Sequence, residues 1–87
     1  MSGDDLAALC AALETTAERP LERSANRWLG EAQAVATDLR DGDPDADTRR
    51  ERLETVRYLL DQVEETGDDE ANEALATAEA HLDALLD

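Results

Sequence analysis

Apolar side chains recur every three or four residues in four stretches of this 87-residue chain. This spacing places them on one face of an α-helix, whereas a strand would alternate apolar and polar residues. No alternating run of β-branched residues occurs, and the 16 alanines favour helix. The sequence therefore predicts an all-α fold, an antiparallel bundle of three or four helices, in a single domain spanning residues 1–87.

Helix boundaries follow from the punctuation between the apolar stretches. Gly42 and Pro44 make the clearest break, because glycine ends a helix and proline cannot continue it. Thr48 and Glu51 have the spacing of a capping box, which predicts the start of the third helix at Thr48. Gly67 predicts a left-handed cap that ends the third helix. The expected helices span residues 4–18, 20–39, 48–65 and 69–86.

The second stretch has the most regular apolar pattern, and it predicts a coiled-coil seam over nearly three heptads. Pro20 fits the first position of this helix, where its missing N–H costs nothing. The apolar phase of the first stretch nearly continues through Pro20, so one long helix kinked there is the alternative. The seam positions are Leu21, Ala25, Trp28, Ala32, Val35 and Leu39, of which we predict Leu21, Trp28, Val35 and Leu39 to form an interaction seam.

Large apolar residues are few in this chain. It has 13 leucines, three valines, one tryptophan and one tyrosine, with no phenylalanine and no isoleucine. A chain this short buries only about 60–65% of its unfolded surface. A second copy or another protein would add to this thin core, so we expect a homodimer or an unidentified protein partner.

Charge composition restricts where such a chain can fold. It contains no lysine, and its eight arginines face 23 acidic residues, giving a formal net charge of −15. The resulting repulsion opposes compaction, but the Debye length falls from about 10 Å at 0.1 M salt to about 3 Å at 1 M. We therefore expect a cytoplasmic protein of an extreme halophile, an archaeon. So acidic a surface repels nucleic acid and anionic lipid, which predicts neither as a partner.

All eight arginines lie between residues 19 and 57, while both ends of the chain are acidic. Arg19, Arg23 and Arg27 recur every four residues, which predicts a stripe along the second helix. The leading interpretation is that arginines pair with acidic residues of the same chain. Pairing between chains is the second, and a nucleic-acid-associated regulator using the stripe is the third.

A run of aspartates around Pro44 suggests a cation site. Asp43, Asp45 and Asp47 occupy positions 1, 3 and 5 of an EF-hand loop, and Glu54 occupies position 12. Position 6 is Thr48, where the sharp turn of an EF-hand requires glycine. A solvated turn is the competing interpretation, and a carboxylate-based metal-binding protein or enzyme is the alternative function.

Other reactive residue types occur singly. His81 is the only histidine and Cys10 the only cysteine, so neither has a partner at metal-ligand spacing. Cys10 excludes an internal disulfide and suits a reducing cytosol. We therefore predict no catalytic residue and no cofactor. The leading function is a non-enzymatic helical interaction or structural module.

The last stretch resembles the closing helix of an archaeal family of short, all-helical, uncharacterised proteins. The residues that carry the resemblance include Gly67-Asp68 and the triplet Leu82-Asp83-Ala84. That family usually has an aromatic residue before the triplet, where this chain has His81. The resemblance implies an all-helical fold and no assigned activity. Its remaining residues are Ala74, Ala78 and Ala80.

Overall fold

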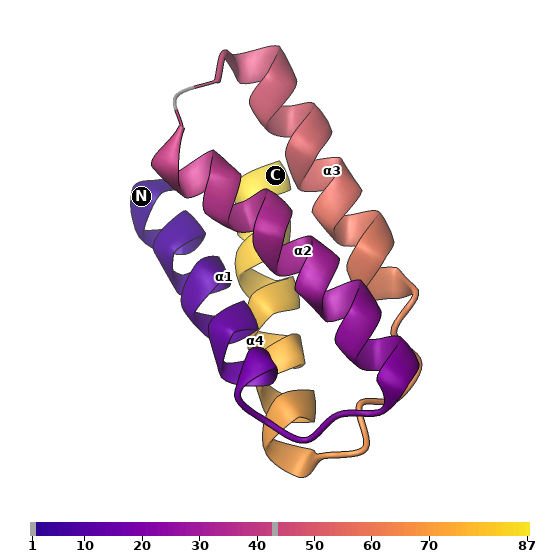
Figure 1. Ribbon diagram of the computed structural model, residues 1–87. Coiled ribbons are helices and arrows are strands. Elements are labelled where there is room, and N and C mark those ends of the chain that lie inside the picture. The colour runs from indigo at the N-terminus through magenta and orange to yellow at the C-terminus, as the bar shows by residue number, and fades with distance from the viewer. Residues whose placement is uncertain (1, 43) are drawn as a thin grey trace.

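The computed structural model describes residues 2–42 and 44–87, and the side chains of residues 5–42 and 44–87. This part of the chain contains no strand and forms helices that run alternately up and down, each antiparallel to its neighbours (Figure 1). The predicted all-α antiparallel bundle is confirmed. Its helices are α1 (Ser2–Ala17), α2 (Arg23–Asp41), α3 (Ala46–Asp61) and α4 (Asp69–Leu86).

The helices close into a ring in which α1 and α3 each lie beside both α2 and α4. The α1–α4 interface is the largest of the four and the α3–α4 interface is the smallest. Because α4 buries Ala71, Ala74 and Ala78, it presents short side chains to the bundle. Short side chains at the contact allow a small distance between helix axes. Close approach therefore contributes to the packing of a chain that has few bulky residues.

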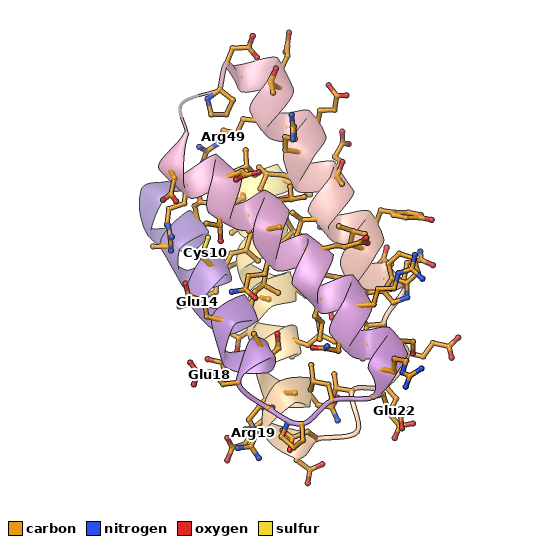
Figure 2. All side chains as sticks on the ribbon, in the orientation of Figure 1. Cys10, Glu14, Glu18, Arg19, Glu22 and Arg49 are labelled. Carbon is orange, nitrogen blue, oxygen red and sulfur yellow. The ribbon has the colours of Figure 1, made fainter. Side chains whose placement is uncertain are left out.

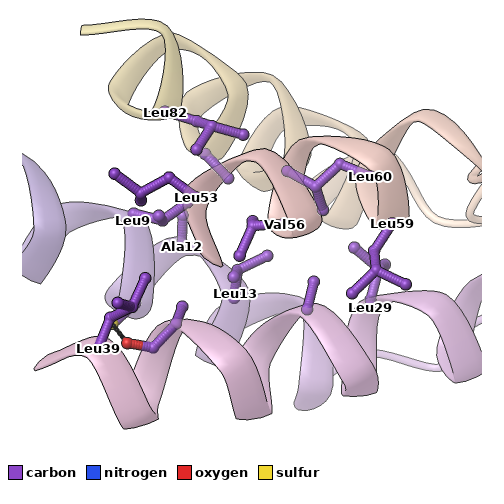
Figure 3. Packing of buried hydrophobic residues seen from close by; sticks show 14 of the residues in the cluster. Leu9, Ala12, Leu13, Leu29, Leu39, Leu53, Val56, Leu59, Leu60 and Leu82 are labelled. Carbon is purple, nitrogen blue, oxygen red and sulfur yellow. Dashed lines mark hydrogen bonds between the residues drawn. The ribbon is translucent and has the colours of Figure 1, made fainter. Parts of the chain in front are cut away.

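The core draws fully buried side chains from all four helices. Leu9 and Leu13 of α1 are completely inaccessible to solvent, and Leu29 of α2, Val56 of α3 and Leu82 of α4 are at most 2% exposed. Figure 3 shows these helices directing their leucines toward a common interior. Full burial of each such side chain contributes roughly 1.5–3 kcal/mol. The described part of one chain thus encloses a continuous apolar core.

The alternative of one long helix kinked at Pro20 is wrong. Residues 18–22 form a connection that reverses the chain direction, and α2 begins at Arg23 rather than at Pro20. The Glu22 N–H donates a 2.8 Å hydrogen bond to the carbonyl oxygen of Thr66 in the α3–α4 connection. The reversal is favourable because it lays α2 against α1 and buries apolar surface of both helices.

Helix α3 also begins earlier than predicted. It starts at Ala46, and Asp45 caps it by accepting a 2.8 Å hydrogen bond from the Thr48 N–H through Oδ1. The predicted capping box at Thr48 is therefore wrong, because Asp45 offers an oxygen three residues before Thr48. The helix ends at Asp61, four residues before the predicted end at residue 65. Gly67 has the predicted left-handed conformation, with φ at +83°, but it does not end α3 as predicted, because the C-cap of that helix is Gln62.

Candidate interaction surface

The predicted interaction seam is divided between the core and the surface. Leu39 is buried, whereas Trp28 and Val35 are half-buried on α2 and Leu21 is half-buried just before that helix. The sequence reasoning missed the true buried face of α2, which has the same alternation of four and three residues. Its members are Ala25, Leu29, Ala32, Ala36 and Leu39.

We call the outer flank of this buried face the α2 edge. It consists of Leu21, Trp28 and Val35, together with the exposed Arg27, and Arg23 lies one helical turn before Arg27 on the exposed side of α2. The three apolar residues are seven positions apart, which is nearly two helical turns, so Trp28 and Val35 lie on one strip of α2. All three pack against the core from outside and keep part of their surface exposed to solvent.

An arginine covers part of the tryptophan on this edge. The Arg27 guanidinium carbon lies 5.6 Å from the centroid of the Trp28 ring, within the range of a cation–π interaction. Among the side chains that the structure describes, no carboxylate comes within 4.0 Å of the guanidinium groups of Arg23 or Arg27. The α2 edge therefore combines a partly exposed aromatic ring with the Arg27 cation, and neither Arg27 nor the nearby Arg23 has an anionic partner among these side chains.

Other arginines form the predicted pairs within the chain. Arg40 of α2 lies 3.5 Å from Glu14 of α1, and Arg57 of α3 pairs with Asp83 of α4. Arg40 is also 3.1 Å from Asp41, and the hydrogen bond to this neighbour raises the pKa of Arg40. The leading interpretation of the charge pattern is thus confirmed for these arginines. Pairing between chains stays a prediction.

The three-arginine stripe does not continue along α2, because Arg19 lies in the α1–α2 connection at one end of the bundle (Figure 2). Its Nε and Nη2 atoms donate to the two carboxylate oxygens of Asp68, at 2.9 and 3.0 Å. This pair joins residues 49 positions apart in the sequence. A helix face carrying Arg19, Arg23 and Arg27 together, which the nucleic-acid interpretation requires, is therefore not formed.

Asp68 links this ion pair to the start of α4. Its Oδ2 also accepts a 2.9 Å hydrogen bond from the Ala71 N–H, so the carboxylate caps the helix. Donors on Arg19 and Ala71 lower the pKa of Asp68, because they stabilise the ionised carboxylate. Nearby, the buried Thr66 hydroxyl donates to Asn72 Oδ1 at 2.6 Å. The two connections at this end of the bundle are thus joined by side chains that are distant in sequence.

The aspartate run does not form an EF-hand loop. Helix α3 begins at Ala46, so Asp47 and Glu54 are exposed helical residues, and Asp45 is engaged as the helix cap. The hydrogen bonds from Thr48 lower the pKa of Asp45. Asp43 lies outside the described residues. Elsewhere in the described chain, no three His, Cys, Asp or Glu residues gather as the ligands of a metal would.

A cavity of about 350 Å³ opens between the C-terminal end of α2 and the N-terminal end of α3. This volume is at the lower limit of typical small-molecule pockets. Val35 belongs both to the cavity and to the α2 edge, so the α2 edge borders α3 at Val35. The periodicity of the sequence could not reveal this cavity, because the cavity forms where α2 and α3 meet the connection between them. Its lining consists of Val35, Asp38, Leu39, Gly42, Pro44, Thr48 and Arg52.

Cys10 and His81 make contacts between helices. The Cys10 thiol is fully buried, lies 3.4 Å from the Ala36 carbonyl oxygen, and has a pKa that burial raises, so it stays protonated. His81 Nδ1 of α4 lies 3.0 Å from Asp5 Oδ1 of α1. Each contact joins two helices of the bundle, Cys10 linking α1 to α2 and His81 linking α4 to α1.

Over the part of the chain that the structure describes, fold and surface together define a small four-helix bundle whose α2 edge carries a half-buried tryptophan. The sequence from residue 5 to residue 87 matches the family described as "Domain of unknown function (DUF8152)". Because the match covers almost the whole chain, the protein belongs to this family, which agrees with the predicted lack of an assigned activity. Neither a curated protein nor a solved structure matches the chain. None of the described helices is long and apolar enough to cross a membrane.

Proposed function

We propose that the protein is a non-enzymatic helical interaction module that binds its partner through the α2 edge. The observation that carries this proposal is the position of Trp28. Among the residues that the structure describes, the buried core contains no aromatic side chain, yet the only tryptophan of the chain is half-buried on the flank of α2. Tryptophan and arginine are enriched among the residues that dominate binding energy at protein interfaces. Trp28 and Arg27 provide both in direct contact.

The chemistry of the α2 edge suits an amphipathic helix with acidic flanks. Trp28 and Val35 form a narrow apolar strip, and a partner helix covers such a strip with residues at heptad spacing. Arg27 beside this strip, and Arg23 one helical turn before Arg27, can each bind a carboxylate through two parallel hydrogen bonds. We take such a helix, with carboxylates beside its apolar stripe, as the occupant of the edge.

We place this activity in the salt-rich cytoplasm of a halophilic archaeon. The supporting observations are the net charge of −15 and the complete absence of lysine. At about 1 M salt the Debye length is about 3 Å, so charges act only at contact distance. Under these conditions apolar contact would contribute most of the affinity, and the arginines would select the partner by direct pairing.

The fluorescence of Trp28 tests the proposal directly, because it is the only tryptophan. The probe is a synthetic, tryptophan-free helical peptide with leucines at heptad positions a and d and glutamates at e and g. It is titrated into the protein at about 2 M KCl, where the Debye length is about 2–3 Å, at a protein concentration low enough for the chain to be monomeric. We expect a saturable blue shift of the emission and weaker quenching by acrylamide, since the peptide covers the indole ring.

Two matched variants separate the α2 edge from the opposite flank of the same helix. Arg27→Gln removes a charge on the edge, and Arg40→Gln removes one on the flank facing α1. We expect Arg27→Gln to weaken peptide binding at least about fivefold and Arg40→Gln to leave it within about twofold. An unchanged Trp28 emission throughout the titration, or equal losses in both variants, would refute the proposal.

A further inference from the structure

Resting on this proposed function, we propose that the occupant of the α2 edge is α2 of a second copy of the chain. The two helices would run antiparallel about a two-fold axis that passes beside Trp28. Such a contact uses the same surface on both copies and therefore closes at two chains. The partner is then a second copy of the protein, which could not be inferred from the residues of the α2 edge alone.

Charge along the exposed side of α2 favours this arrangement. Arg23 and Arg27 precede Trp28, whereas Glu31 and Asp38 follow it. All four charged residues are exposed. An antiparallel second copy brings the basic half of each helix against the acidic half of the other, twice by symmetry. A parallel copy would align like charges, which is unfavourable.

The spacing of the apolar residues defines the register. Leu21 and Val35 lie seven residues before and seven residues after Trp28. A two-fold axis at Trp28 therefore places Val35 of each copy toward the N-terminal end of α2 of the other, just after Leu21. Arg27 and Glu31 lie on either side of Trp28, so the same axis brings Arg27 of each copy within a helical turn of Glu31 of the other.

The required contact is modest in size. A stable interface buries about 800 Å² on each partner. The described chain exposes 5300 Å², so the dimer would cover about a seventh of it. Each copy has a net charge of −15, so repulsion between whole molecules opposes this contact until salt screens it. Dimerisation should therefore strengthen as KCl rises, which distinguishes it from an association driven by long-range attraction.

Charge-reversal substitutions at Arg27 and Glu31 test the register of the two helices about the two-fold axis. Sedimentation equilibrium of the full chain at about 2 M KCl should give a mass near twice 9.5 kDa. We expect Arg27→Glu and Glu31→Arg each to weaken dimerisation by about tenfold or more, and the double variant to recover most of the loss. Glu31→Arg lowers the net negative charge, so reduced repulsion alone would strengthen the dimer. Pairing of Arg27 with Glu31 across the axis and general repulsion between the copies therefore predict opposite effects of Glu31→Arg on the dimer.

Glu73→Arg provides the matched control, because it makes the same charge change at an exposed position of α4. It should leave the dimer as strong or stronger. Circular dichroism verifies that each variant is folded, and Arg27→Gln with Glu31→Gln tests the same pair if a charge reversal unfolds the chain. A dimer that keeps its strength in both single reversals would overturn the inference.

The remaining outcomes separate this inference from the proposed function. A protein that stays monomeric at every KCl concentration, while the leucine–glutamate peptide still covers Trp28, overturns the second copy as partner and retains the interaction module. A dimer in which acrylamide quenches Trp28 as strongly as in the diluted monomer forms through another face and overturns the inference. Failure of both dimerisation and peptide binding overturns both proposals.

Discussion

The substitution Leu13→Ala tests whether one chain encloses its own core. Leu13 is completely inaccessible to solvent and belongs to the cluster shared by all four helices. The change removes three carbon atoms, which costs about 2.4 kcal/mol in transfer free energy at roughly 0.8 kcal/mol per buried CH₂. The cavity left behind raises the loss to about 3–4 kcal/mol. This is a large part of the roughly 4–13 kcal/mol expected for a domain of this length.

Thermal unfolding followed by circular dichroism at about 2 M KCl measures this effect. A loss of 1 kcal/mol lowers the Tm of a domain this small by about 4–8 °C, so Leu13→Ala should lower it by at least about 12 °C. Leu21→Ala is the control, because Leu21 keeps part of its surface exposed. It should lose less than about 1.5 kcal/mol. If Leu13→Ala and Leu21→Ala lower the Tm equally, the helices do not pack as described.

Three further predictions test local features of the bundle. Gly67→Ala should destabilise the fold by about 1–2 kcal/mol because the φ of Gly67 is +83°. Gly30→Ala should stabilise the fold by up to about 1 kcal/mol, because no atom lies near the added methyl group. Urea unfolding of the two variants measures both changes in the free energy of unfolding, and changes of the same sign would contradict the prediction. Because Arg19 lowers the pKa of Asp68, their pairing should stabilise the fold above the ordinary carboxyl pKa and be lost as the pH falls through the lowered pKa. Urea unfolding at a series of acidic pH values should therefore show that the free energy of unfolding falls less steeply with pH in Arg19→Gln than in the Arg23→Gln control. Identical curves for the two variants would exclude a stabilising role for the Arg19–Asp68 pair. Helicity measured across a KCl series should rise with salt as the net charge of −15 is screened, and a chain equally folded and heat-resistant in deionised water would contradict the halophilic interpretation.

Features governed by neighbouring residues could be predicted from the sequence. The helical class follows from apolar spacing, which depends only on the geometry of the helix. The break after α2 and the left-handed Gly67 follow from the backbone preferences of glycine and proline, which act over one or two residues. The start of α3 was missed because Asp45 and Thr48 are both good cap residues, and only the backbone geometry selects Asp45.

The face of α2 that enters the core is a tertiary property. One apolar register contains Trp28 and Val35, and the other contains Leu29 and Ala36 one residue further along. Periodicity supports both registers, so the choice depends on the shapes of the neighbouring helices. The small Ala36 fits where Cys10 of α1 approaches its carbonyl group, which leaves Trp28 on the flank. The candidate interaction surface is a consequence of that choice.

The chain by itself therefore determined the helices, the principal break between them and the acidic surface, because these depend on local spacing and on composition. Tertiary structure alone decided that α1 and α2 are two helices rather than one kinked helix, that Arg19 binds Asp68, and that Trp28 lies at the edge of the core. The physical reason is distance along the chain. Packing and ion pairing join residues tens of positions apart, and their free energy exists only once the helices have come together.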